Sequence, residues 1–153
     1  MSLSIGPFGI MTIIHAILAL FLIIELGLSA WLVDKSISWY WSGSPMSFIL
    51  FGCIWSFLVL LYVSLVPRFI TRIHMPIVSV VLASVTMIFW FAGSTAQAVR
   101  IGIPSCGKDG PCQATQAVVA FGYFLWAGFS SLVALEALAL WKSRGPAAQP
   151  SAV

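Results

Sequence analysis

The chain has 153 residues, of which 61% are hydrophobic and only 7% are charged, and its net charge is +3. Ordinary soluble domains carry about 25% charged residues, so a soluble fold of this length would lack the polar groups needed to cover its surface. The few Lys and Arg residues form no run or stripe, which argues against a nucleic-acid partner. The composition therefore predicts a single-domain integral membrane protein.

Four long apolar runs occupy most of the chain, and we expect each to form a membrane-spanning helix. They cover residues 8–33, 46–66, 76–99 and 114–141. Each is long enough for a helix that rises ~1.5 Å per residue to cross ~30 Å of hydrocarbon. Strands of about 10 residues with alternating polarity, typical of membrane barrels, do not occur. The prediction is an all-α bundle of four transmembrane helices over residues 1–145, followed by a short disordered tail at 146–153.

Basic residues indicate which helix ends face the cytosol. The connection after the second run holds Arg68 and Arg72 and no acidic residue, and the tail after the fourth run begins with Lys142. Lys and Arg favour the cytosolic side of a membrane. Both termini are therefore predicted to be cytosolic in an M-shaped topology, with loops 34–45 and 100–113 outside.

Two cysteines lie in the connection before the fourth run. Cys106 and Cys112 flank a segment in which Gly107, Gly110 and Pro111 allow the chain to turn back, so that the two sulfurs can meet. Outside the cell or in the secretory pathway, nearby thiols tend to pair. We therefore predict a disulfide that ties the end of the third helix to the start of the fourth.

The alternative to a structural disulfide is a redox-active cysteine pair, as in four-helix membrane oxidoreductases that pass electrons to a quinone. Such an enzyme needs a second cysteine pair, whereas the chain offers only Cys53, which stands alone in the second apolar run. No Gly-rich phosphate loop, His-Glu-x-x-His motif or nucleophile elbow is present, and the cysteines lack the further ligands of a zinc site. We therefore expect no catalytic residues, no cofactor and no metal.

Three ionisable residues fall inside the predicted helices, where such groups are costly and suggest a function. They are His15, Glu25 and Glu136. The first and fourth helices run in opposite directions. His15 and Glu136 are therefore expected at the same level, where they would meet if these two helices are neighbours.

Glu25 lies in the outer half of the first helix, where other polar groups are expected at the same depth. The third helix offers Ser94 and Thr95 there, and the fourth offers Tyr123. Such groups form either a proton or ion path, or hydrogen bonds that hold helices together at about 0.6–2 kcal/mol each. Pro occurs only at helix ends, and the middles of the second and third helices carry no charge. These features favour structural contacts over conduction.

Small residues four positions apart are a further packing signal, because helix backbones approach closely where such residues share a face. The pairs are Ser79 with Ala83 and Ala92 with Ala96 in the third helix, and Ala127 with Ser131 and Ser130 with Ala134 in the fourth. They predict helix packing within the bundle, and a homo-oligomer face is the alternative.

Three stretches carry a family resemblance. Residues 88–98 read IFWFAGSTAQA, residues 112–126 read CQATQAVVAFGYFLW, and residues 132–138 read LVALEAL. The aromatic-Ala stretch, the Cys before the fourth helix, and the Ala-Phe-Gly with its aromatic cluster resemble small fungal members of the MARVEL-domain family. The likeness covers residues 88–138 in motif and essentially the whole chain in topology.

This resemblance implies an M-shaped four-helix bundle with both ends cytosolic, and it brings no catalytic residues. It implies a role in membrane apposition, vesicle trafficking or the organisation of plasma-membrane subdomains. The expected partners are membrane lipids, such as sterol or sphingolipid, other membrane proteins and further copies of the chain. The expected location is the plasma membrane or secretory-pathway vesicles. The alternative function is a small transporter or proton-linked channel that uses Glu25, His15 and Glu136.

Overall fold

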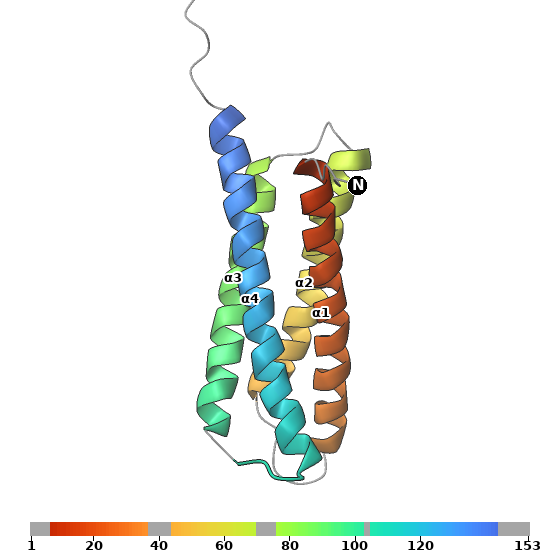
Figure 1. Cartoon of the computed structure of the whole chain (residues 1–153), viewed down its shortest axis with the longest axis vertical. Helices are drawn as coiled ribbons and strands as arrows, with labels where there is room; N and C mark the ends of the chain where they lie inside the picture. The colour runs from red at the N-terminus through yellow and green to blue at the C-terminus, as the bar shows by residue number, and fades with distance from the viewer. Residues whose placement is uncertain (1–6, 37–43, 70–75, 103–104, 144–153) are drawn as a thin grey trace, which may run out of the picture.

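The computed structural model describes residues 7–36, 44–69, 76–102 and 105–143. They form four α-helices: α1 (Pro7–Ser36), α2 (Ser44–Phe69), α3 (Pro76–Ile101) and α4 (Gly110–Ser143). The helices lie side by side along the long axis of the molecule, and the start of α1 and the end of α4 lie at the same end (Figure 1). The predicted all-α fold with four helices is confirmed. The predicted tail at 146–153 lies outside the described residues.

Proline marks the start of every helix. Pro7 and Pro76 are the first residues of α1 and α3, and Pro45 and Pro111 are the second residues of α2 and α4. A residue in the first helical turn has no intrahelical partner for its N–H, so the missing proton of proline costs nothing there, and its fixed φ suits the helix. The prolines thus help to define where each span begins.

The helices extend beyond the apolar runs, most clearly at the start of α4. This helix begins at Gly110, whereas the apolar run predicted a start at residue 114. The Asp109 N–H donates to the Cys106 carbonyl at 2.9 Å, and the Gln113 N–H donates to the Asp109 carbonyl at 3.1 Å. Hydropathy marks where lipid contact begins, but backbone hydrogen bonding continues for another turn into the polar loop.

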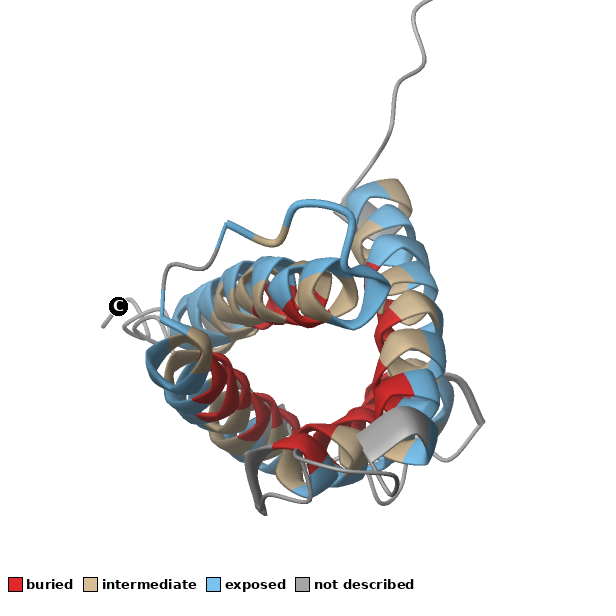
Figure 2. Ribbon diagram, turned by 90° about the horizontal axis from the view of Figure 1, so that it is seen from below, coloured by how far each residue is buried: buried red, intermediate tan, exposed pale blue. Residues whose placement is uncertain are grey.

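Each helix packs against two neighbours, so that the four form a closed ring in the order α1, α2, α3, α4. Seen end-on, the buried residues face the inside of the ring and the exposed residues face outward (Figure 2). The outward side chains are large and apolar on every helix. Among them are Ile23, Leu58, Ile88 and Phe124, each between 56% and 60% exposed.

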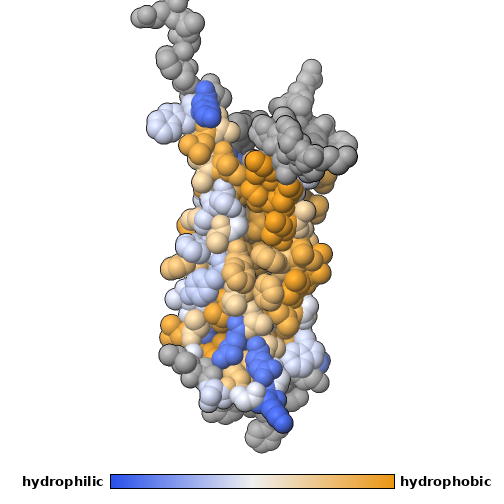
Figure 3. Space-filling view, viewed as in Figure 1, coloured by the Kyte–Doolittle hydropathy of each residue, from blue (hydrophilic) through white to orange (hydrophobic). Residues whose placement is uncertain are grey.

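This outer surface fits lipid rather than water. All four helices are long and apolar enough to cross a membrane. On the face in Figure 3, apolar side chains cover the middle of the molecule and the most hydrophilic side chains gather towards its two ends. Apolar surface on this scale is uncommon on soluble monomers. The chain is therefore a multi-pass integral membrane protein.

Two glycines bring α4 close to its neighbours. A Cβ atom at Gly128 would lie 2.5 Å from Cδ2 of Leu18, which is only 1% exposed on α1. A Cβ atom at Gly122 would collide with the Ser94 hydroxyl of α3. Close approach at small residues is the main source of helix association in membranes, where lipid competes equally for apolar contacts.

Gly128→Val should weaken the α1–α4 contact, because the added methyl groups collide with the buried Leu18 side chain. Overpacking of this kind costs about 1–3 kcal/mol, which thermal or denaturant unfolding in detergent would measure. Gly27→Val is the matched control, because nothing lies within 4 Å of a Cβ atom there. Adding Leu18→Ala to Gly128→Val should restore part of the loss. Equal destabilisation by the Gly27 and Gly128 variants would contradict this account.

Candidate functional site

The bundle interior is rich in polar side chains. In the part of the chain that the structure describes, the buried polar residues are Glu25, Ser29, Ser56, Ser79, Thr86, Ser94, Gln97 and Thr115. Several hydroxyls donate to a carbonyl of their own helix, such as Ser56 to Gly52 at 2.7 Å and Thr86 to Leu82 at 2.8 Å. Such bonds satisfy a hydroxyl where no water is present.

Two tryptophans link α2 to α3 through hydrogen bonds that the sequence analysis missed. The Trp90 indole N–H donates to the Ser56 hydroxyl at 2.9 Å, and the Trp55 N–H donates to the Thr86 hydroxyl at 3.1 Å. Each hydroxyl thus accepts from a neighbouring helix while it donates to its own. The spacing of Thr86 and Trp90, four residues apart on one helix face, was the available signal.

Glu25 is the most unusual of the interior residues. Its side chain is 0% exposed, and neither carboxylate oxygen has a hydrogen-bond partner among the described residues. Its electrostatic neighbour on α2 is the Cys53 thiol, which also interacts with Ser29 one turn below Glu25 on α1. An ionised carboxylate left unpaired in a low-dielectric interior would cost tens of kcal/mol by the idealised Born estimate. Glu25 is therefore a buried residue whose position the hydrogen bonds of the described residues do not explain.

The residues expected around Glu25 separate into two groups. The Thr95 and Tyr123 hydroxyls lie 3.2 Å apart and form a hydrogen bond between α3 and α4. Ser94 is buried where α3 meets Gly122, and within the part of the chain that the structure describes its hydroxyl has no hydrogen-bond partner. None of the three bonds to the Glu25 carboxylate.

No hydrogen bond or ion pair joins His15 to Glu136 among the described residues, although α1 and α4 are neighbours. Leu18 packs at the level of Gly128. Counted from that contact, Glu136 lies about 7 Å further along the bundle than His15, at ~1.5 Å per residue. The His15 Nδ1 atom lies 2.7 Å from the Met11 carbonyl, while its Nε2 and one oxygen of Glu136 are buried without a partner. The prediction measured the depth of each residue from the middle of its apolar run, and the two runs differ in length. The Leu18–Gly128 contact aligns α1 and α4 differently from the middles of those runs.

The small-residue pairs face in different directions. Ser79 and Ala83 are 3% and 0% exposed inside the bundle. Two of the other pairs, Ala92 with Ala96 on α3 and Ala127 with Ser131 on α4, face outward. Both Gly122 and Gly128, which make the close α4 contacts, stood outside the predicted pairs. Spacing of four residues shows that two side chains share a face, but not which face it is.

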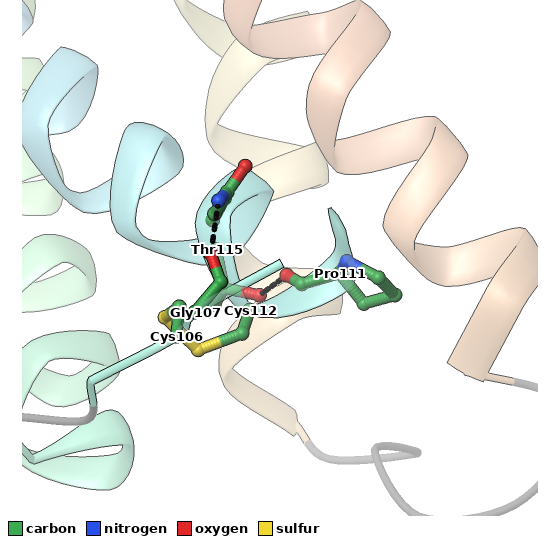
Figure 4. The surroundings of a disulfide bond; sticks show 6 residues. Cys106, Gly107, Pro111, Cys112 and Thr115 are labelled. Carbon is green, nitrogen blue, oxygen red and sulfur yellow. Dashed lines mark hydrogen bonds between the residues drawn. A yellow bond between two sulfur atoms is a disulfide. The ribbon is translucent and has the colours of Figure 1, made fainter. Parts of the chain in front are cut away.

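The predicted cysteine pair closes the turn before α4. The sulfurs of Cys106 and Cys112 lie at disulfide distance, and their Cα atoms are 5.5 Å apart (Figure 4). Gly107 between them adopts a φ of +51°, which suits glycine. The Gln113 side-chain amide donates to the Gly107 carbonyl at 2.8 Å, and the Thr115 hydroxyl donates to the Pro111 carbonyl at 2.7 Å. The Gln113 bond holds the turn against α4, and the Thr115 bond lies within the first turns of that helix.

The described residues offer few groups for redox or metal chemistry. Cys53 is buried in the middle of α2, whereas Cys106 lies in the turn before α4 and Cys112 in the first turn of that helix. No group of three or more His, Cys, Asp and Glu side chains is arranged to hold a metal ion within those residues. The interactions observed between helices in the interior are hydrogen bonds, such as those of Trp90 with Ser56 and of Thr95 with Tyr123.

Ser56→Ala should destabilise the protein, because it leaves the buried Trp90 N–H without its acceptor. The expected loss in the free energy of unfolding is about 1–2 kcal/mol. Ser84→Ala is the matched control, because the Ser84 hydroxyl bonds to the Val80 carbonyl of its own helix. In a double-mutant cycle with Trp90→Phe, the two losses should be less than additive. Additive losses would show that no such bond exists.

We expect Cys106 and Cys112 to be oxidised in the mature protein. A membrane-impermeant maleimide added outside the cell without reductant should then leave both unmodified, and reduction should expose both. Replacing both by serine should cost about 2 kcal/mol, because the closed loop is short. Ready labelling of both cysteines before reduction would refute the disulfide.

Comparison with known proteins identifies the family of this bundle. A family model described as a membrane-associating domain, MARVEL, matches residues 6–135. No curated protein and no solved structure matches the chain. The matched region includes the first three helices and most of α4. The chain therefore belongs to the MARVEL family of membrane-associating domains.

Proposed function

We propose that this protein is a non-enzymatic organiser of membrane subdomains, membrane apposition or vesicle trafficking, acting through lateral contacts within the bilayer. The observation that carries the proposal is the distribution of surface. All four helices turn large apolar side chains outward around the whole ring, and the described connection outside the helices is a short cysteine turn. Contacts in the plane of the membrane are therefore the main interactions that this surface supports.

Lipid is the first proposed partner. An apolar groove of about 190 Å³ runs between α1 and α4, lined by Ile14, Ile17, Leu18, Phe21, Phe124, Gly128 and Ser131. A sterol ring or one chain of a sphingolipid has the apolar character that this groove would accept. Gly128 lies in the lining of this groove, in close contact with the Leu18 side chain.

Protein contacts are the second proposed means of action. Ala92 and Ala96 on α3, and Ala127 and Ser131 on α4, present small side chains to the outside of the bundle. Outward small residues permit close approach of a helix from another copy or another membrane protein. We propose these two outward pairs as the surface for lateral association.

The proposed orientation places both termini in the cytosol, and the location is the plasma membrane or secretory-pathway vesicles. The basic connection with Arg68 and Arg72 supports this sidedness. The cysteine pair lies at the opposite end of the bundle, where an oxidising compartment would favour the disulfide. The motif over residues 88–138 supports placement among the fungal members of the family.

The alternative function, a small transporter or proton-linked channel, requires a connected polar path. His15, Glu25 and Glu136 each retain a buried atom without a hydrogen-bond partner. The structure therefore supplies three separate polar groups, which favours the organising role. The quinone-linked redox enzyme would need a second cysteine pair beside the loop, but Cys53 is single and lies within α2.

The test is self-association of the labelled protein in vesicles, measured by energy transfer at lipid-to-protein ratios that make random encounters rare. Wild type should show transfer well above the random level. Ala92→Leu with Ala127→Leu should lower it, because the added side chains prevent close helix approach. Ala16→Leu with Ala30→Leu is the matched control, since both alanines are exposed on α1.

Two results would overturn the proposal. One is energy transfer no greater than random for wild type, together with uniform distribution of the tagged protein in its own cell. The other is proton or solute flux through vesicles that contain the protein and that is lost in Glu25→Gln. That second result would establish the transporter instead.

A further inference from the structure

The groove between α1 and α4 runs along one half of the membrane-spanning region. Phe21 and Phe124 line one end of it, and Ile14 and Ser131 line the other. Phe21 lies at the middle of the membrane span of α1, and Phe124 lies close to the middle of that of α4. Ile14 and Ser131 are each seven residues further, about 10 Å at ~1.5 Å per residue, towards the end of the bundle where α1 begins and α4 ends (Figure 1). Half of the hydrocarbon layer is about 15 Å thick, so the groove lies within a single leaflet.

Three phenylalanine rings pack together at the mid-membrane end of the groove. The ring centroid of Phe21 lies 5.7 Å from that of Phe121 and 6.0 Å from that of Phe124, and the last two are 6.2 Å apart. Aromatic rings at these separations attract one another. The groove therefore ends at a cluster of packed rings, against which the end of a hydrocarbon chain can lie.

The groove is continuous with the surface that the bilayer covers. Ile17 and Phe124 in its lining are 47% and 56% exposed, whereas Leu18 between the helices is 1% exposed. The lining residues are all described, and none of them is charged. The single side-chain hydroxyl among them, that of Ser131, donates to the Gly128 carbonyl at 2.7 Å. The groove therefore offers an apolar wall that opens directly to lipid.

We propose that this groove binds one acyl chain of a phospholipid from the leaflet in which α1 begins, with the terminal methyl group at the phenylalanine cluster. This site deepens the proposed lipid contacts and rests on them, but it is independent of self-association. A chain in the groove would contact protein on several sides, and each additional pair of atoms adds a small dispersion attraction. That preference is needed because the chain is already surrounded by hydrocarbon in the bilayer.

The dimensions of the groove favour a chain over wider occupants. A volume of about 190 Å³ spread over about 10 Å gives a cross-section of roughly 19 Å². One extended hydrocarbon chain fits such a cross-section, whereas the fused rings of a sterol need a wider groove. A helix from a second copy, about 10–12 Å across with its side chains, is wider still.

Charge at the end of α4 favours a phosphate-bearing lipid. Lys142 is exposed and lies eleven residues beyond Ser131, close to three full turns, so the two share one face of the helix. Lysine side chains near the ends of membrane helices extend to the headgroup layer. The phosphate of a lipid whose chain lies in the groove would therefore meet a positive charge on the same face. A sterol has no charge to match it.

Photo-crosslinking of the full chain in phosphatidylcholine vesicles tests the site. The probe is a trace of phosphatidylcholine with a diazirine near the end of one chain, and peptide mass spectrometry locates the adducts. Ile54 and Ile88 are the internal controls, because they lie near the middle of their spans and are 54% and 57% exposed, like Phe124 at 56%. Adducts on Phe124 should exceed those on either control by about fivefold, which corresponds to about 1 kcal/mol.

Two matched variants test whether the excess depends on the groove. Ile17→Trp should remove the excess, because the larger side chain fills the groove. Ile13→Trp should retain it, because Ile13 is similarly exposed on α1, at 45% against 47%, but is not in the lining. Loss of the excess in both variants would contradict a site at the groove.

Two results with wild type would overturn this inference. One is an equal yield of adducts on Phe124, Ile54 and Ile88. The other is an excess on Phe124 with a photoactivatable sterol but not with the phospholipid probe. Energy transfer, measured on the same vesicles, separates this inference from the organising role. Equal adducts with transfer above the random level refute the groove alone, whereas random transfer with the excess retained refutes the organising role alone.

Discussion

The structure depends on the requirement that each backbone N–H and C=O inside the hydrocarbon layer be satisfied within its own segment. Four continuous helices meet it, and the prolines fall in their first turns, where a missing N–H is harmless. Once the backbone is satisfied in this way, lipid can solvate the apolar side chains. Ile23, Leu58 and Ile88 therefore face outward into lipid, whereas exposure of so many large apolar side chains to water would be unfavourable. The surrounding lipid explains why the outer side chains are apolar. The contacts in the interior determine which helices pack together.

The interior makes this selection with polar bonds and close contacts. Apolar packing alone distinguishes helix from lipid poorly, because both offer hydrocarbon. The Trp90–Ser56 and Trp55–Thr86 bonds pair α2 with α3. Gly122 allows α3 to approach α4 closely, and Gly128 allows α1 to do the same. A hydroxyl that already donates to its own helix can accept from a neighbour without losing a bond, so serine and threonine serve well at these contacts.

The four helices and the cysteine pair could be predicted because they depend on local composition: long apolar runs, and two cysteines separated by a short glycine-containing segment. The register between helices could not. His15 and Glu136 were expected at one level, but the Leu18–Gly128 contact places them at different levels. Spacing likewise grouped Ala92 with Ala96 and Ser79 with Ala83, yet only the second pair faces inward. Which stripe of an apolar helix turns inward depends on its neighbours, and a helix that is hydrophobic all round carries little record of that choice.

Glu25 is the residue that packing does not explain. A charged side chain near the centre of a transmembrane helix costs at least about 2.5–3.5 kcal/mol during insertion, and here no hydrogen bond from the described residues repays it. A leucine would fill the same interior as Leu18 and Leu22 do, without that cost. The hydroxyls of Ser29, Ser56 and Thr86 are satisfied within the bundle, so polarity as such is not unfavourable there. The Glu25 carboxyl differs because none of the described residues forms a hydrogen bond with it. Helix packing therefore accounts for the serines and the threonine of the interior, and it does not account for the carboxyl.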